Sequence, residues 1–502
     1  MFTSILPRLF ACAAVALMAL APCGGAYAAG PTFVNFELAA TPPQPVGTTC
    51  PGGGSSCTNI AAEPMIRAAA DGAFYASSEN GLGGGTDAWK SIDGGNHFSS
   101  LASPNQTSAT QGTGFAPGGG DTDLAVAPAP NAAGFRNVYV SSLTLAEVDV
   151  STSADGGTTW HLNPTGAQVP GDDREWIAAD GASTVCISYH DAATFNIDVD
   201  CSSDAGATFT QHALPGAIDV GHAFLVDNNE IGNLAIDPVS HTVYQTFSGP
   251  SDLAGTTACG GFTCLNTVWM AVSTDGGRTF TDYPVYANPN IDVSYGHQFV
   301  NVSVDQAGNV YSVFSDDHSV YYSFSTDHGQ TWSAPVQVNA APSATAIMPW
   351  SVAGAAGKID IVWYGTSYHD RATPPDSYPA SAAWYVFFAQ SLSATSGGGF
   401  TQVSATPVVH YGGVCESGVT CSGNRDLYDD FGVAASPITG LASIVYSDDQ
   451  WSTDPNSPPP PGCTQSQSNT GACDHTSIAT QLTGSGIYQG SQPSTSRRGH
   501  RP

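Results

Sequence analysis

The chain has 502 residues, of which 41% are hydrophobic and only 11% are charged. Its 42 acidic residues outnumber its 12 basic ones, giving a formal net charge of −30. This excludes a binder of nucleic acid or of anionic membrane surfaces, because phosphate groups require Lys and Arg. The 56 glycines and 34 prolines are typical of many short strands and turns and exclude a protein of long helices.

The first 28 residues have the pattern of a secretory signal peptide. Arg8 supplies a small basic region, residues 9–20 form an apolar run, and residues 26–28 offer the small side chains that signal peptidase needs. The run is too short to cross a bilayer, which takes about 20 apolar residues, and no later segment reaches that length. We therefore predict Sec-type secretion without a membrane span. Lipidation at Cys23 is the alternative.

Seven similar units are predicted between residues 60 and 484. Each begins with an apolar strand, continues through a turn into a second strand, and then has a third. The predicted first strands are residues 64–69, 123–127, 176–179, 232–236, 299–304, 350–353 and 431–435. The last unit has only three obvious strands, the third at residues 476–482. Residues 32–39 alternate like a strand, and we expect them to supply its missing outer strand and to close a ring.

A short motif, Ser-x-Asp-x-Gly-x-Thr-aromatic, recurs after the third strands. Its five copies are residues 91–98, 153–160, 202–209, 273–280 and 325–332, and a decayed sixth copy is residues 393–400. Ser and Asp side chains can bond backbone N–H groups of a turn, and Gly admits the positive φ that a hairpin requires. The aromatic residue buries apolar area against a neighbouring element. The motif therefore predicts a structural role.

This motif resembles the Asp box, or BNR repeat, of the sialidase-like superfamily. The resemblance implies an all-β fold, a β-propeller of about seven four-stranded blades, with six as the alternative count. It also implies that the motif joins the two outer strands of a blade, on the face away from the ligand site. The predicted propeller covers residues 29–484, and the Gly/Ser/Gln-rich residues 485–502 are predicted to form a disordered tail.

Ten of the 12 cysteines follow the signal peptide and fall into close pairs, which in an exported chain predicts disulfides. The pairs are Cys50/Cys57, Cys186/Cys201, Cys259/Cys264, Cys415/Cys421 and Cys463/Cys473. Positions 186 and 201 are nearly symmetrical about a turn at residues 191–194, so we expect them to face each other across a hairpin. Loops this short constrain little chain entropy, and each bridge is expected to make a loop rigid.

The ligand face of a propeller holds the starts of the innermost strands and the loops after the second strands. Acidic side chains are frequent at these positions, and they include Glu63, Glu79, Asp121, Asp123, Asp173, Glu175, Glu230, Asp316, Asp317, Asp429 and Asp430. Glycoside hydrolysis needs two carboxyl groups. We therefore take Glu175, Glu63 and Asp430 as candidate catalytic residues. The alternative is that these carboxylates cap strand ends and turns.

Five further residues are candidates for substrate binding: Arg174, Arg425, Trp350, Tyr364 and His297. Arg174 beside Glu175 would lower the pKa of one carboxyl group, while burial near an aromatic ring would raise that of another. Trp350 and Tyr364 either stack on a sugar ring or pack in the inner core.

The sequence departs from sialidases at the motif that carries their activity. Sialidases of this superfamily have an Arg-Ile-Pro motif at the start of the first blade, with two later arginines that bind the substrate carboxylate. The matching stretch is residues 62–67, where Glu63 has roughly the place of the first arginine. A glutamate there would repel sialic acid. The resemblance thus predicts the fold and does not predict a strict sialidase.

Three functions remain open. The first is a glycoside hydrolase of sialidase-like scaffold that takes a neutral or basic sugar. The second is a non-catalytic extracellular propeller that binds a glycan or a protein. The third is a structural protein stabilised by Ca²⁺, although no strict calcium loop is present. We expect a monomer, no organic cofactor, and a structural Ca²⁺ as the one ion that the acidic residues suit.

Overall fold

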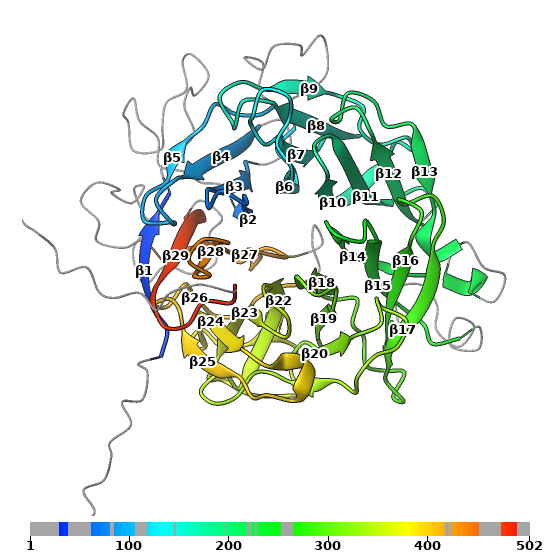
Figure 1. Ribbon diagram of the computed structural model, residues 1–502. Coiled ribbons are helices and arrows are strands. Elements are labelled where there is room, and N and C mark those ends of the chain that lie inside the picture. The colour runs from blue at the N-terminus through cyan, green and yellow to red at the C-terminus, as the bar shows by residue number, and fades with distance from the viewer. Residues whose placement is uncertain are drawn as a thin grey trace, which may run out of the picture.

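The protein is a seven-bladed β-propeller in which seven antiparallel sheets surround a common axis (Figure 1). The computed structural model describes residues 30–38, 62–80, 85–105, 118–144, 147–194, 196–217, 222–225, 228–252, 265–416, 421, 424–450 and 473–488. The predicted all-β class and the count of seven blades are confirmed. The predicted signal peptide lies outside the described residues.

The first four blades are each formed by four consecutive strands, numbered from the axis outward. Blade 1 contains β2 (Ala62–Ala68), β3 (Phe74–Glu79), β4 (Thr86–Ser91) and β5 (Ser99–Ser100). Blade 2 contains β6 (Thr122–Val126), β7 (Val138–Leu143), β8 (Val148–Ser153) and β9 (His161–Asn163). Blade 3 contains β10 (Asp172–Asp180), β11 (Thr184–Asp191), β12 (Asn196–Ser202) and β13 (Gln211–Ala213). Blade 4 contains β14 (Glu230–Ile236), β15 (Val243–Gly249), β16 (Thr267–Ser273) and β17 (Thr281–Ala287).

The last three blades complete the ring. Blade 5 contains β18 (Asn301–Val304), β19 (Val310–Ser315), β20 (Val320–Ser325) and β21 (Val336–Gln337). Blade 6 contains β22 (Thr345–Ala353), β23 (Ile359–Thr366), β24 (Ala383–Ser391) and β25 (Thr401–Ser404), with β26 (His410–Tyr411) also paired to β24. Blade 7 contains β27 (Gly432–Ala435), β28 (Ala442–Asp448), β29 (His475–Thr483) and β1 (Thr32–Glu37). Within the described residues, four 3₁₀ turns lie between strands: η1 (Pro215–Ala217), η2 (Ala223–Leu225), η3 (Pro375–Ser377) and η4 (Ala394–Ser396).

The N-terminal strand closes the ring, as the sequence predicts. β1 pairs antiparallel with β29, where Phe36 lies opposite Ile478. It also contacts blade 6, because Phe33 packs edge-on against Phe388 with ring centroids 5.1 Å apart. Blade 7 therefore combines both ends of the chain, with β1 as its outermost strand covering the edge of β29.

The repeated motif forms the turn between the third and fourth strands of blades 1 to 5. In residues 273–280, Ser273 Oγ bonds Asp275 Oδ1 at 2.8 Å and accepts the N–H of Gly277 at 2.9 Å. Asp275 also accepts the N–H and hydroxyl of Thr279, at 3.0 and 2.7 Å. The decayed copy in blade 6 contains η4 instead, and Phe400 packs against Tyr322 at 5.1 Å. The motif residues thus have the structural role predicted for them.

Two of the predicted disulfides are formed, Cys186–Cys201 and Cys415–Cys421. The first joins directly opposed residues of β11 and β12, as predicted from the symmetry about the turn. Cys473 is also disulfide-bonded. Cys50, Cys57, Cys259, Cys264 and Cys463 lie outside the described residues.

The packed chain extends beyond the predicted boundary at residue 484. Ile487 is fully buried, and it exchanges backbone hydrogen bonds with Ala355 of blade 6 and Gly440 of blade 7. Tyr488 lines a cavity of about 260 Å³ at the far ends of the innermost strands. Residues 485–488 therefore belong to the propeller. Among the helices of the described residues, none has the length and hydrophobicity to span a membrane.

Candidate functional site

Several innermost strands begin with a β-bulge at the same end of the ring. The register of β2, β10, β14 and β22 shifts by one extra residue near the strand start. In three of them a non-glycine residue has positive φ: Glu63 at 47°, Arg174 at 54° and Met348 at 51°. This conformation costs energy for residues with a Cβ, and such strain and bulges gather at functional sites. The bulges place Glu63 and Arg174 at one mouth of the axis.

Arg174 is the centre of an ion-pair cluster that joins four blades. Its guanidinium bonds Asp430 before β27, and its Nη1 lies 3.8 Å from Glu63 Oε2 and 3.9 Å from Asp121 Oδ2. Arg174 and Glu63 are only 4% and 1% exposed. Since a buried charge is tolerated only when it is paired, this cluster fixes the relative positions of blades 1, 2, 3 and 7.

A second arginine joins the cluster from the segment before blade 7. Arg425 Nη2 lies 2.6 Å from Asp429 Oδ2 and 3.4 Å from Glu63 Oε1, which also accepts the N–H of Asp429 at 3.2 Å. Glu63 therefore lies between two guanidinium groups. Oxygens of Glu63, Glu79 and Asp121 all lie within 4.8 Å of one another, so two arginines face a larger number of carboxylates.

Carboxylates surround the cluster on all sides of the mouth. Besides Glu63, blades 2 to 5 and the segments beside them provide Asp121, Asp173, Glu230 and Asp317, and the segment between blades 6 and 7 provides Glu416 and Asp429. Their charges interact: that of Asp121 raises the pKa of Asp173, that of Asp173 raises the pKa of Glu230, and that of Asp317 raises the pKa of Glu416. The mouth is thus strongly acidic.

Burial and like charges raise the pKa values of the acids at this mouth. Burial is the largest cause for Glu63, whose pKa lies well above its usual value, and neighbouring Asp121 and Glu79 add to the effect. Burial likewise raises the pKa of Glu79 to about 8 and that of Asp430 to about 7, although Arg174 opposes the shift of Asp430. Several of these acids therefore carry a proton at neutral pH.

These raised pKa values predict that stability falls as pH rises. A carboxyl group whose folded pKa exceeds its unfolded value binds more protons in the folded state. Its stabilising contribution is complete below the unfolded pKa of about 4 and is lost as pH rises through the folded pKa, here about 8 for Glu79 and Glu230. We expect a higher melting temperature at pH 5 than at pH 8, measured by calorimetry at constant ionic strength.

The double variant Glu79→Gln/Glu230→Gln provides the control for this dependence. It removes two of the titrating groups and should flatten the change of melting temperature between pH 5 and 8. An equal or higher melting temperature at pH 8 in the unmodified protein would contradict the assignment of protonated acids at the mouth.

The structure places the other predicted site residues at different depths. Glu175 is fully buried beneath Arg174, and its carboxylate oxygens form no hydrogen bond with the described residues. Trp350 is 3% exposed and packs against Trp176, with ring centroids 5.0 Å apart. Tyr364 is fully buried and accepts the N–H of Ser447 at 2.9 Å. Trp350 and Tyr364 thus pack in the inner core, the second of the two positions expected for them.

Aromatic rings close the axis below the cluster. Trp176 packs edge-on against Phe299 at 5.6 Å, and the Arg174 guanidinium stacks 3.9 Å above the Trp176 ring. Trp176 belongs to blade 3, Phe299 directly precedes the first strand of blade 5, and Trp350, which also packs on Trp176, belongs to blade 6. They form the floor of the mouth and separate it from the cavity at the other end.

His297 lies at the rim, where its side chain is 56% exposed and its Nδ1 is 2.7 Å from Asp317 Oδ2. Its neighbour Gln298 donates to Glu416 at 2.5 Å and accepts the N–H of Met348 at 2.6 Å.

Three further acids of the mouth were not predicted as site residues. The sequence predicted that Asp121 and Glu79 lie at the mouth but gave them no role, and it did not predict Glu416. The one signal for Glu416 is its position next to the bridged Cys415.

Comparison with known proteins shows likeness at the level of structure only. No family model matches the chain, and no curated protein does. A GH93 α-L-arabinofuranosidase of Fusarium graminearum, solved with arabinobiose, is 16% identical, with a TM-score of 0.43 over 66% of this chain and 93% of that one. A GH74 xyloglucanase from Xanthomonas campestris is 12% identical, with a TM-score of 0.47 over 82% of this chain and 52% of the other.

A sialidase from Streptococcus pneumoniae is 9% identical, with a TM-score of 0.39 over 84% of this chain and 68% of that one. The similar solved structures thus include sialidase-like and glycoside hydrolase propellers. Identities this low carry no information about the substrate of this chain, because one fold supports many functions.

Proposed function

We propose that this protein is a glycan-active propeller, a glycoside hydrolase whose active site is the acidic mouth and whose substrate is a neutral or basic sugar. The observation that carries the proposal is the carboxyl pair of Glu63 and Asp121, whose oxygens lie within 4.8 Å of each other on one side of Arg174. Two neighbouring carboxyl groups with different environments are what glycoside hydrolysis needs.

The environments of the two groups suggest their roles. Burial raises the pKa of Glu63, and its Oε2 has no hydrogen-bond partner among the described residues, so a proton can reside there. Glu63 is therefore the general acid of the proposal. Asp121 is more accessible, with a side chain 16% exposed, and acts as nucleophile. The close approach of their oxygens supports a retaining reaction, in which the carboxyl groups are about 5–5.5 Å apart.

Arg174, Asp430 and Glu175 are positioning residues in this proposal. Asp430 binds the guanidinium of Arg174 from one side, and the fully buried Glu175 lies beneath it as a further counter-charge. Arg174 in turn approaches both Glu63 and Asp121. His297 and Arg425, at 56% and 28% side-chain exposure, are the accessible candidates for contact with substrate.

The charge of the mouth supports neutral or basic substrates. Arg174 and Arg425 are already paired with Asp430 and Asp429. An anionic sugar would thus meet an excess of carboxylates, because each of these two guanidinium groups already has a carboxylate partner.

Burial favours a second function, a non-catalytic propeller that binds a glycan or a protein. Glu63 is 1% exposed and participates in contacts with two arginines, an arrangement that also suits a purely structural ion-pair cluster. Secretion and a monomeric state are part of either proposal, and the two disulfides support an oxidising compartment.

The test is release of reducing sugar by the mature protein from a panel of neutral, amino and acidic oligosaccharides. We expect release from neutral or amino sugars, its loss in Glu63→Gln, and its retention in Asp180→Asn. Asp180 pairs with His241 at the opposite strand ends and provides the matched control. If the folded protein releases nothing while it binds members of the panel, the binding function replaces the hydrolase.

A further inference from the structure

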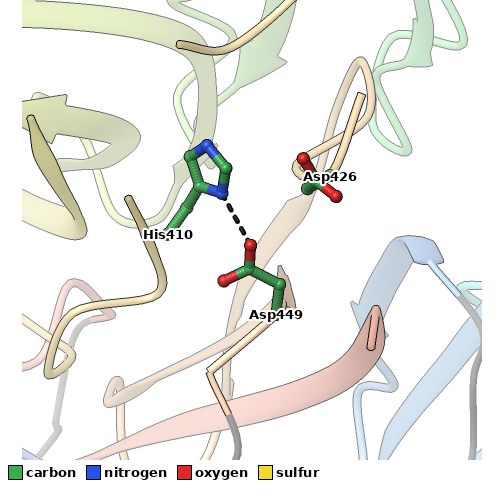
Figure 2. A group of neighbouring side chains, drawn as sticks. All are labelled: His410, Asp426 and Asp449. Carbon is green, nitrogen blue, oxygen red and sulfur yellow. Dashed lines mark hydrogen bonds and ion pairs between the residues drawn. The ribbon is translucent and has the colours of Figure 1, made fainter. Parts of the chain in front are cut away.

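A second group of buried side chains lies between blades 6 and 7, apart from the mouth cluster. His410 is in β26, Asp449 follows β28, and Asp426 is in the segment before blade 7. All three are buried, at 0%, 0% and 3% exposure. One nitrogen of His410 and one oxygen of each aspartate lie within 4.8 Å of one another (Figure 2).

The hydrogen bonds of His410 define how its ring can act. Nε2 lies 3.1 Å from the carbonyl oxygen of Gly413, which can only accept, so Nε2 carries a proton. Nδ1 lies 2.7 Å from Asp449 Oδ2. Either a proton lies between Nδ1 and Asp449 Oδ2, on the ring or on the carboxyl group, or the Nδ1 lone pair and the Asp449 carboxylate share a cation. In metal sites, a backbone carbonyl commonly holds the other ring nitrogen of a ligating histidine in this way.

The surroundings of the Asp426 carboxylate favour the shared cation. Its carboxylate stands beside the His410–Asp449 pair, with no bond drawn to either residue (Figure 2). Its Oδ2 is buried and has no hydrogen-bond partner among the described residues, and neither Asp426 nor Asp449 pairs there with a Lys or Arg. Asp474, only 1% exposed, is a further buried acid that interacts electrostatically with Asp426 and Asp449. One proton shared by His410 and Asp449 leaves the Asp426 carboxylate uncompensated, and a buried unpaired carboxylate is costly.

We propose that His410 Nδ1, Asp449 and Asp426 bind a divalent transition-metal ion, for which Zn²⁺ is the first probe. A nitrogen and carboxylate oxygens suit Zn²⁺ or Mn²⁺, whereas Ca²⁺ takes six to eight oxygens. The ion would tie β26 and the end of β28 to the segment before blade 7. That segment carries Arg425 next to Asp426, so the metal would hold Arg425 against Glu63. The site is independent of the proposed hydrolase function.

The chain offers a matched control that also consists of one histidine and two aspartates. His212 contacts Asp200 through Nδ1 at 2.7 Å and Asp198 through Nε2 at 3.2 Å. Because each ring nitrogen faces a different aspartate, the three cannot share one ion at a single nitrogen. His212→Gln should therefore leave metal binding unchanged.

The experiment is calorimetric titration of the full mature protein, stripped with a chelator, with Zn²⁺, Mn²⁺ or Ca²⁺, combined with metal analysis by mass spectrometry. We expect one tightly bound equivalent of Zn²⁺ or Mn²⁺, at least tenfold weaker binding in Asp426→Asn, and loss of binding in His410→Gln. Metal should raise the melting temperature of the unmodified protein and of His212→Gln, and not that of Asp426→Asn.

Asp426→Asn preserves the side-chain shape and decides the matter if His410→Gln does not fold. The proposal is overturned if the unmodified protein holds no tight equivalent, if it binds Ca²⁺ alone, or if Asp426→Asn binds metal as well as the unmodified chain does. An equal loss of metal binding in His212→Gln would also overturn the proposal, because the loss would then not be specific to His410.

Discussion

Arg174→Met is expected to destabilise the protein by about 3–5 kcal/mol at pH 8, the cost of removing one partner from a buried ion-pair cluster. The substitution keeps an unbranched apolar side chain above Trp176 but removes the guanidinium that contacts Asp430, Glu63 and Asp121. Buried carboxylates would then remain without their nearest cation. The free energy of unfolding in urea measures the effect.

The same substitution should cost less at pH 5. The pKa of Asp430 is raised to about 7, and that of Glu63 is also raised, so both groups are largely protonated at pH 5 in the folded protein. Without Arg174 their pKa values would rise further, and neutral acids need no counter-charge. The difference in unfolding free energy between variant and unmodified protein should therefore increase from pH 5 to pH 8.

Arg278→Met provides the control. Arg278 is exposed and contacts only the turn at Asp275, so its loss should change the unfolding free energy by less than about 0.5 kcal/mol at either pH. A cost for Arg174→Met below about 1 kcal/mol at pH 8, or one independent of pH, would show that the cluster is not buried as described.

The fold was predictable because its determinants are local. The motif around Asp275 satisfies its turn with hydrogen bonds inside eight residues, so the sequence motif and the turn correspond directly. The closing strand β1 was predictable for a related reason: the last unit lacked one strand, and residues 32–39 alternate in the sequence. Local hydrogen bonding and strand periodicity require no knowledge of distant contacts.

The site was predictable only in outline. The list of strand starts identified Glu63, Arg174 and Asp430, which the structure brings together. It did not predict the bulges that aim Glu63 and Arg174 at the axis, because neither residue is a glycine and nothing local indicates positive φ. The strain there is maintained by tertiary contacts between blades more than one hundred residues apart in the chain.

The burial of each side chain also could not be predicted from the sequence. Glu175 directly follows Arg174 in β10, yet it is fully buried with no hydrogen bond to the described residues, whereas Arg174 pairs with Asp430 and Glu63. Trp350 packs across the axis on Trp176 of blade 3, a contact that depends on how wide a ring of seven blades is. His410, Asp426 and Asp449 come from three separate segments, and no spacing in the sequence relates them.

For the proposed hydrolase, Glu63→Gln and Asp121→Asn are each expected to lower kcat by about 10²–10⁴-fold on natural glycans, the usual contribution of a positioned acid or base. The two variants should differ in their dependence on the leaving group. An acidic phenol departs without protonation. On an aryl glycoside with such a leaving group, the loss of kcat in Glu63→Gln should therefore be at least tenfold smaller than on natural glycans. Asp121→Asn should recover nothing, because bond formation to the sugar still requires its carboxylate.

The pH profile gives an independent readout of the same assignment. The unmodified enzyme should lose activity at alkaline pH as the proton of the general acid is lost, and Glu63→Gln should lack that limb of the profile. Asp180→Asn should keep both limbs, since its carboxylate lies at the opposite strand ends. If both mouth variants recover equally with the activated substrate, Glu63 is not the acid. If neither loses activity on the natural glycan, catalysis occurs elsewhere, and the mouth cluster holds the blades together without taking part in the reaction.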